Sequence, residues 1–197
     1  DPTGNGNVAA TQYTWAYDST APTLSSVGIV SSNSDTSLAK VGDVVTLSFT
    51  SSEVVGTPTV TIAGQSATVT NTSDNDWTAT YTMTSYETEG AISFSIAFDD
   101  AVGNAGTAVT AVTDSTSVTF DSTAPTLSSV GIVSSNSDTS LAKVGDVVTL
   151  SFTSSEVVGT PTVTIAGQSA TVTNTSDNDW TATYTMTSYE TEGAISF

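Results

Sequence analysis

The side chains that could do chemistry in this sequence are mostly carboxylates. An aspartate precedes each of two identical Ser-Thr-Ala-Pro segments, and further acids lie in a DDAVGN loop and after a repeated apolar run. The candidate ligands are Asp18, Glu53, Asp99, Asp100, Asn104, Asp121 and Glu156. Oxygen ligands on loops that contain glycine suit Ca²⁺, which binds roughly 6–8 oxygens from carboxylates, amides, backbone carbonyls and water. The loop is not an EF-hand, because it lacks the spacing and the closing glutamate of that motif.

The composition argues against catalysis. The chain has no His, which is the commonest general base, and no Cys. A Ser-His-Asp or Cys-His nucleophile therefore cannot form, and neither can a disulfide or a thiolate metal site. We expect a protein that is not an enzyme.

The charge balance excludes other partners. Lys and Arg total 2, namely Lys40 and Lys143, against 20 Asp and Glu, which gives a net charge of −18. Such a chain cannot build the basic patch that nucleic-acid binding needs, and an anionic membrane surface would repel it. No stretch approaches the roughly 20 apolar residues of a membrane helix, and the opening residues DPTGNGN do not form a signal-peptide pattern. We expect neither nucleic-acid binding nor membrane insertion.

The chain contains a long internal repeat. Residues 18–94 recur without a mismatch as residues 121–197, at an offset of 121 − 18 = 103 residues. About 100 residues is the size of one small domain rather than of a solenoid unit. Residues 1–17 resemble the end of such a repeat, since DPTGN parallels DAVGN and WAYDSTAP parallels VTFDSTAP. We therefore predict the final loop and strand of a preceding domain at 1–17, a complete domain at 18–120 and an incomplete copy at 121–197.

Two explanations of the incomplete copies stay open. The chain is either a window of a longer tandem array or a subunit whose N-terminal strand fills the gap of a neighbouring chain. The first explanation is favoured, because the same join recurs in any tandem array. An incomplete sandwich leaves an open sheet edge in either case.

The hydrophobic pattern has a period of two, which is typical of half-buried strands. It predicts seven strands in one repeat, at 24–32, 44–51, 58–63, 66–72, 76–84, 91–99 and 107–120, with a bulge or a break near Asp114 in the last. Seven short antiparallel strands in about 100 residues indicate an all-β fold of tandem immunoglobulin-like β-sandwiches. Trp77 is expected in the core, and a core position is favoured for Tyr13, Trp15 and Tyr17 as well.

Strand parity predicts where the acids meet. The loops after the second, fourth and sixth strands return to the pole from which the first strand leaves. Asp18 should therefore lie near Glu53, near Asp74 and Asp76, and near the loop with Asp99, Asp100 and Asn104. The opposite pole carries Asp35, Asp43, Glu87 and Glu89 and is expected to face Asp121 and Glu156 of the next domain. Solvated Asx-turns explain a single such loop, but the added linker aspartate favours calcium.

At this point the sequence resembles a known family. The segments DSTAP, AKVGDVVTLSFTSSE, VTIAG, WTATYT and FDDAVGN are similar to the bacterial immunoglobulin-like tandem repeats of giant secreted surface adhesins. The resemblance implies an extracellular stalk on the cell surface, with neighbouring repeats as partners and Ca²⁺ at the junctions. It implies Asp18 and Asp121 as linker ligands and Asp99, Asp100 and Asn104 as loop ligands. Asp1 and Asn5 are their counterparts in the preceding unit, where DPTGN has one aspartate instead of two.

Three functions are carried forward from the sequence. The first is a non-catalytic extender module of a secreted adhesin or surface filament. The second is a carbohydrate-binding accessory sandwich of a secreted enzyme, which requires exposed aromatic side chains that lie together. The third is a filament subunit that is assembled by strand donation, in which residues 1–17 pair with a different chain.

Overall fold

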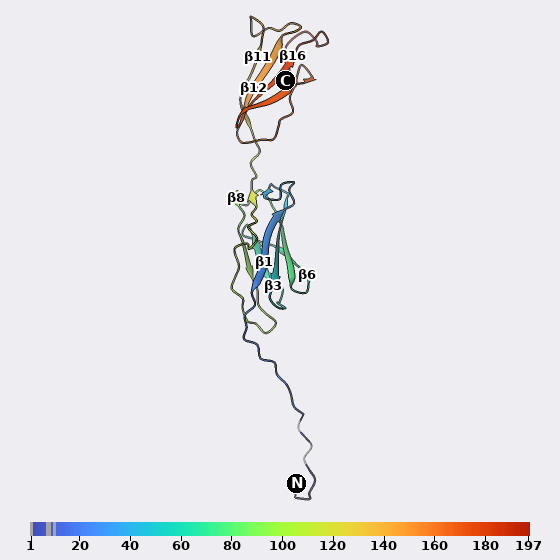
Figure 1. Cartoon of the computed structure of the whole chain (residues 1–197), viewed down its shortest axis with the longest axis vertical. Helices are drawn as coiled ribbons and strands as arrows, with labels where there is room; N and C mark the ends of the chain where they lie inside the picture. The colour runs from blue at the N-terminus through green and yellow to red at the C-terminus, as the bar shows by residue number, and fades with distance from the viewer. Residues whose placement is uncertain (1, 7–8, 10) are drawn as a thin grey trace. The chain divides into compact units, whose positions relative to one another are not determined.

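The computed structural model describes residues 2–6, 9 and 11–197, and these residues form strands, turns and extended segments without a helix (Figure 1). The all-β prediction is thus confirmed for the described part of the chain. The chain divides into two compact units, Asp1–Ser122 (unit 1) and Thr123–Phe197 (unit 2). No helix among the described residues has the length and apolarity that crossing a membrane requires.

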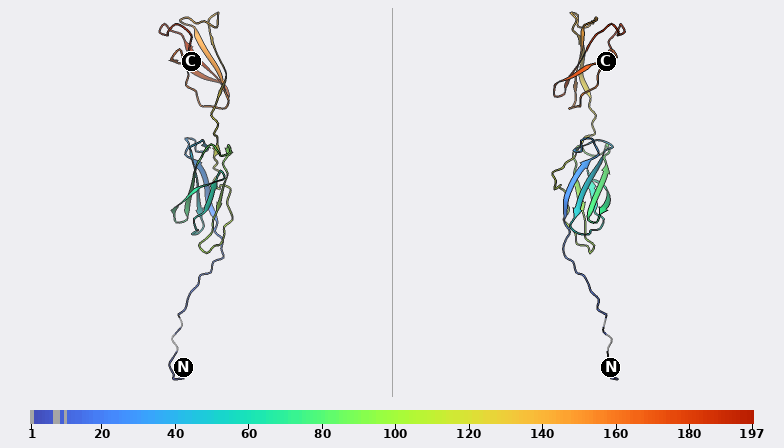
Figure 2. Two further views of the ribbon diagram at one scale, coloured as in Figure 1. Left: turned by 180° about the vertical axis from the view of Figure 1, so that it is seen from behind. Right: turned by 45° about the vertical axis from the view of Figure 1, so that its right-hand side comes forward.

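Unit 1 is built on a four-stranded antiparallel sheet. Its strands are β1 (Leu24–Ser31), β3 (Val44–Ser51), β7 (Asp76–Thr82) and β6 (Thr68–Ser73), in the order β1-β3-β7-β6. Figure 2 shows these strands side by side from two directions. β3 alternates between buried Val45, Leu47, Phe49 and Ser51 and the more exposed Val44, Thr46, Ser48 and Thr50. This alternation gives the sheet one apolar face that must be covered.

Two smaller sheets complete unit 1. The first has the order β5-β4-β9, with β5 (Gln65–Ser66), β4 (Thr59–Ile62) and β9 (Phe94–Ala97). The second has the order β2-β10-β8, with β2 (Leu38–Ala39), β10 (Thr119–Phe120) and β8 (Gly90–Ala91). β10 runs parallel to β2 and antiparallel to β8. The short β10 therefore joins two segments that are far apart in the sequence.

The apolar side chains of these sheets form one core, so that unit 1 has a sandwich-like architecture. The core contains Trp77, which is 8% exposed, and this confirms its predicted position. Its largest fully buried side chains are Phe49, Phe120, Leu47, Ile62, Met83 and Ile96. Phe120 and the neighbouring Val118 come from the closing segment, which we define as residues 98–120. The closing segment is therefore part of the core.

The prediction of one long strand at 107–120 is wrong, although the predicted break near Asp114 is present. Only β10 is a strand in this range, and Val109 forms an isolated bridge with Ile96. The Asp114 carboxylate accepts hydrogen bonds from the Thr116 amide (3.0 Å) and hydroxyl (2.6 Å), and Ser115 has a φ of 64°. This local turn lies at the break, since a φ of 64° is outside the extended conformation of a regular strand.

The N-terminal aromatic residues were also predicted wrongly. Tyr13, Trp15 and Tyr17 are 80%, 91% and 90% exposed instead of buried in a core. Residues 11–17 form no strand and run as an extended trace (Figures 1 and 2). The predicted loop and strand at 1–17 include residues 1, 7, 8 and 10, which lie outside the described residues. The alternating aromatic residues of this segment are thus typical of a β-strand, but residues 11–17 pair with no other strand in the structure.

Unit 2 repeats the large sheet with the order β11-β12-β16-β15. Its strands are β11 (Leu127–Ser134), β12 (Val147–Ser154), β16 (Asp179–Thr185) and β15 (Thr171–Ser176). A hairpin of β13 (Thr164–Ile165) and β14 (Gln168–Ser169) corresponds to β4 and β5 of unit 1. The core of unit 2 is smaller and contains the buried residues Val148, Leu150, Phe152, Ile165, Trp180 and Ala182. Residues 141–142 and 193–194, which are the counterparts of β2 and β8, are not strands in unit 2.

Candidate functional site

Three carboxylates from distant parts of the sequence meet at one end of unit 1. One oxygen each from Asp18, Glu53 and Asp100 lies within 4.8 Å of the other two. Asp18 precedes β1, Glu53 follows β3, and Asp100 follows β9. We call this group the three-carboxylate cluster. Its members are three of the acids that strand parity placed at a common pole, and Asp74, Asp76 and Asp99, which parity placed there as well, are not in it.

Backbone pairing fixes the three segments that carry the cluster. The Ser52 amide donates to the Thr23 carbonyl (2.9 Å), and the Thr23 amide donates to the Ser52 hydroxyl (3.0 Å). These two bonds hold the start of β1 against the end of β3. Val55 forms an antiparallel bridge with Asp100, and the Gly56 amide donates to the Asp99 carbonyl (3.0 Å). The loop with Glu53 is therefore held against the loop with Asp100.

Asp100 is the buried member of the cluster, and its carboxylate accepts several hydrogen bonds. It is buried, and its Oδ1 accepts hydrogen bonds from the amides of Val102 (2.9 Å), Gly103 (2.7 Å) and Asn104 (2.8 Å). Burial raises the pKa of Asp100, but the hydrogen bonds from Asn104, Val102 and Gly103 outweigh this effect and hold the pKa below 3.8. Asp100 is therefore a carboxylate at neutral pH, and it shapes the loop that contains it.

Asn104 joins the loop to the linker aspartate. Its Nδ2 donates to Asp100 Oδ2 (2.7 Å) and to the backbone carbonyl of Asp18 (3.3 Å). Asp18 is exposed, and its Oδ1 accepts a hydrogen bond from the Thr20 amide (2.9 Å). Glu53 is half-buried, and its backbone carbonyl accepts a bond from the Ser51 hydroxyl (2.7 Å). The side chains of all three carboxylates are thus held near one another by loops with fixed backbones.

The other predicted ligands lie elsewhere or lack a comparable group. The Asp99 carboxylate is exposed and is not one of the three in the cluster. The Asp121 amide donates to the Ala39 carbonyl (2.9 Å) in unit 1. Glu156 in unit 2 is the counterpart of Glu53, and its buried Oε1 has no hydrogen-bond partner among the described residues. Asp1 lies outside the described residues, so its predicted role cannot be compared.

The sequence analysis did not single out Asn75, although it lies between Asp74 and Asp76. Its backbone carbonyl accepts bonds from the Ser51 amide (2.9 Å) and hydroxyl (3.2 Å). Its side-chain Oδ1 is buried without a hydrogen-bond partner in the described part of the chain, as is that of Asn178 in unit 2. The same Ser51 hydroxyl contacts the Glu53 carbonyl, so Asn75 lies beside the loop that supplies Glu53. The only sequence signal was its position between two acids.

The cluster fits calcium by the type of its donors. It offers only oxygen, and the two cationic side chains of the chain, Lys40 and Lys143, form ion pairs with Asp43 and Asp146 instead. The Asp100 oxygens already accept four hydrogen bonds, so Asp18 and Glu53 have the greater capacity to bind a cation. Three carboxylates provide part of the roughly 6–8 oxygens that Ca²⁺ takes. Carbonyl groups and water would have to provide the rest.

The acids of the opposite pole make local hydrogen bonds. Asp35 Oδ1 accepts bonds from the Ser37 amide (3.0 Å) and hydroxyl (2.7 Å), and these bonds hold its pKa below 3.8. Glu87 accepts a bond from the Tyr81 hydroxyl (2.6 Å), which lowers the pKa of its carboxyl group. These carboxylates cap turns, which is a sufficient explanation of their positions.

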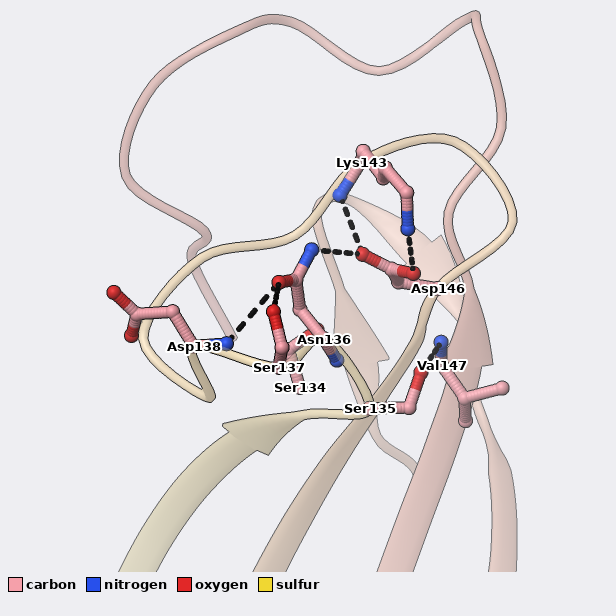
Figure 3. Close-up of polar contacts among 8 residues, drawn as sticks. All are labelled: Ser134, Ser135, Asn136, Ser137, Asp138, Lys143, Asp146 and Val147. Atoms are coloured by element: carbon pink, nitrogen blue, oxygen red, sulfur yellow. Dashed lines mark hydrogen bonds and ion pairs between the residues drawn. The ribbon is translucent and has the colours of Figure 1, made fainter.

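Figure 3 shows the turn of unit 2 that contains Asp138 and Asp146, which are the copies of Asp35 and Asp43. Asp146 accepts bonds from Lys143 Nζ (2.6 Å), from the Lys143 amide (2.9 Å) and from Asn136 Nδ2 (2.8 Å). The Lys143 side-chain bond, together with these backbone and Asn136 bonds, lowers the pKa of Asp146 to about 2. This carboxylate therefore holds the loop closed.

Comparison of the chain with protein-family models, with curated proteins and with solved structures found no match.

Proposed function

We propose that this chain is a non-catalytic extender module, or stalk, of a secreted bacterial surface adhesin or surface filament. The observation that carries the proposal is that one sequence builds two separate units, each with a core of its own. A protein that repeats a whole domain without varying it gains length rather than new sites. The lack of His and Cys agrees with a spacer that performs no catalysis.

We further propose that each repeat is an immunoglobulin-like sandwich. The order β1-β3-β7-β6 has the pattern of the ABED sheet of such domains, when strands are lettered along the chain and the short β2 is left out. β4 and β9 are then the C and F strands, and the closing segment runs in the place of strand G. In these domains the loops gather at the two ends, which is where the three-carboxylate cluster lies.

Calcium is the cofactor that we propose for the three-carboxylate cluster. Asp18, Glu53 and Asp100 repel one another when all three are ionised, and a divalent cation relieves this repulsion. A bound ion would fasten the linker aspartate to two loops of the domain and stiffen the start of the repeat. Sites in extracellular modules have dissociation constants of about 10⁻⁴–10⁻³ M, which suits a protein outside the cell.

Thermal unfolding of residues 18–122 with and without millimolar Ca²⁺ tests the calcium proposal, with Mg²⁺ as the control ion. Free calcium at 1 mM is about 1–10 times such a Kd and stabilises the domain by about 0.4–1.4 kcal/mol, which raises the Tm by roughly 2–11 °C for a domain of this size. The substitution Glu53→Gln should abolish the rise, because it removes one of the three charges. Glu89→Gln, at the opposite pole, is the matched control and should keep it. An equal response to Mg²⁺, or none to either ion, would refute a calcium site.

Carbohydrate binding remains the second candidate, because Tyr13, Trp15 and Tyr17 are all exposed. Stacking on sugars needs aromatic rings that are held rigidly together. These three residues lie on a segment without a strand, and Trp77 is buried, so the extender is the better supported function. Retention of the chain on insoluble polysaccharide, lost on Trp15→Ala, would reverse this order.

A further inference from the structure

The segment that joins the two units begins inside unit 1. β10 ends with Phe120, which is 1% exposed and packs into the core. Asp121 and Ser122 follow directly and still belong to unit 1. We call residues 121–125, which have the sequence DSTAP, the exit linker. The contacts of its first two residues therefore decide where the chain leaves unit 1.

Hydrogen bonds hold the start of the exit linker on unit 1. The Asp121 amide donates to the Ala39 carbonyl (2.9 Å), which continues the contact of β10 with β2 beyond Phe120. The Ser122 amide (3.0 Å) and the Ser122 hydroxyl (2.7 Å) both donate to Oε1 of Glu89. The exit linker is thus bound by a backbone carbonyl and, one residue further on, by a carboxylate.

The pairing of β8 with β10 places Glu89 beside the exit linker. Phe120 pairs with Gly90 in antiparallel register, and the next position along this register brings Glu89 to the start of the linker. Glu89 is exposed and lies outside the core, so its carboxylate contributes no core packing. Hydrogen bonds to an ionised carboxylate are stronger than those between neutral groups. The side chain of Glu89 is therefore suited to hold the linker.

At the other end, unit 2 holds the chain at Thr126. The Thr126 amide donates to the Ser155 hydroxyl (2.9 Å), and the Ser155 amide donates to the Thr126 carbonyl (2.8 Å). Residues 123–125 lie between these two anchored ends. Pro125 has a fixed φ and restricts Ala124 to extended conformations. The joint between the units is therefore short, and its length depends on whether Ser122 is held.

We propose that Glu89 is a positioning residue for the exit linker. Its carboxylate fixes Ser122 to unit 1, so that the joint between the units begins at Thr123. Without this carboxylate only the Asp121 amide bond remains, and the backbone of Ser122 becomes part of the joint. A joint with fewer rotatable bonds samples fewer conformations, so Glu89 restricts bending between the units. This role needs neither calcium nor the extender function.

Spin labels on the two units test the proposal in the 197-residue chain. Thr70→Cys and Thr173→Cys place the labels at equivalent exposed positions of β6 and β15, and the chain has no Cys of its own. The samples contain a chelator, so that no divalent cation contributes, and are diluted with unlabelled chain. Glu89→Ala should broaden the distribution of distances between the labels, because it releases Ser122.

Two further variants separate this role from a general effect of the substitution. Glu89→Gln keeps an oxygen acceptor for Ser122, and its distribution should stay close to that of the unmodified sequence. Glu192→Ala changes the exposed copy of Glu89 in unit 2 and should have no effect. An unchanged width in Glu89→Ala, or equal broadening by Glu192→Ala, would overturn the proposal.

Backbone ¹⁵N relaxation shows at which residue the joint begins. The Ser122 amide should have an order parameter near that of rigid backbone, about 0.85, and Glu89→Ala should lower it toward the values below about 0.6 that are typical of flexible segments. Phe120 should keep its value in both chains, because it lies in the core. Ser122→Ala removes only the hydroxyl bond and should give an intermediate value. A Ser122 amide that is already flexible in the unmodified chain would refute this role of Glu89.

Discussion

Units 1 and 2 share one sequence over residues 18–94 and 121–197, but they differ in structure. Their large sheets have the same strand order and the same register. The strands β2 and β8 are present in unit 1, whereas the same residues form no strand in unit 2. Val27 is 0% exposed, and its copy Val130 is 46% exposed. The large sheet thus forms from local sequence, and the other face depends on the closing segment.

Some core side chains are buried equally in both units, and others are buried in unit 1 alone. Phe49 and Phe152 are 2% and 4% exposed, because their cover comes from strands that both units possess. Met83 is 1% exposed, whereas its copy Met186 is only partly buried. The closing segment therefore stabilises one half of the sandwich much more than the other.

The largest expected effect comes from removing the main anchor of the closing segment. Phe120→Ala should destabilise unit 1 by about 3–5 kcal/mol, because it leaves a cavity beneath β2 and β8. Hydrogen exchange at residues 90–92 should then approach the rate at residues 193–195 of unit 2. Val102→Ala, at a side chain that is 64% exposed, should change stability by less than about 0.5 kcal/mol. Equal exchange in the two units of the unmodified chain would contradict the comparison.

A matched pair of glycines gives an intermediate effect. A Cβ on Gly28 would lie 2.2 Å from Oδ2 of Asp114, whereas a Cβ on its copy Gly131 meets no atom within 4 Å. Asp114 cannot turn away freely, because its other oxygen caps the turn at Thr116. Gly28→Ala should cost unit 1 about 1–3 kcal/mol through overpacking.

Gly131→Ala should leave unit 2 unchanged or slightly more stable, since alanine replaces a flexible glycine in a strand. Chemical denaturation of the two variants measures both effects. A similar loss from both substitutions would show that the backbone bulge in the first strand, rather than Asp114, requires the glycine.

The smallest expected effect concerns acid stability. The Tyr81 hydroxyl bond and the bonds from Thr84 lower the pKa of Glu87 below 4.5, although burial raises it. A lowered pKa in the folded state contributes stability above the pKa of the unfolded chain, and this stability is lost as the pH falls through the folded pKa. Tyr81→Phe should therefore raise the pKa of Glu87 and weaken unit 1 most at neutral pH.

Tyr184→Phe is the control in unit 2, where Glu190 makes the same bonds but is more exposed. Its effect should be smaller, because solvent screens the exposed carboxylate. NMR titration of the two glutamates measures both shifts. A larger shift at Glu190 than at Glu87 would contradict the idea that the closing segment consolidates unit 1.

Much of the fold could be predicted from the sequence, because period-two alternation is a local property. The runs around Leu47 and Ala79 form central strands as expected, and Trp77 is in the core. The run at 107–120 has the predicted break at Asp114, but only Thr119–Phe120 form a strand and Val109 makes an isolated bridge, which alternation does not reveal. Residues 11–17 failed for a different reason: their pattern needs a partner strand, which no local rule supplies.

The candidate site was predictable in outline only. Strand parity brings Asp18, Glu53 and the DDAVGN loop to one pole, and the structure places carboxylates from all three together. Parity could not separate Asp100, which is buried beneath its own loop, from Asp99, which is exposed. It also could not indicate Asn75, whose side-chain Oδ1 is buried without a hydrogen-bond partner among the described residues.

The most direct test of the calcium-stiffened extender is the distance between two spin labels that lie on either side of the three-carboxylate cluster. Ala16→Cys places one label in the exposed segment before Asp18, and Ser85→Cys places the other on an exposed turn of unit 1, with no other Cys present. Samples are measured in Ca²⁺ and in a chelator, diluted with unlabelled chain. A calcium-stiffened stalk predicts a narrow distance distribution in Ca²⁺ that broadens in the chelator. A broad distribution that is the same in both would contradict the account.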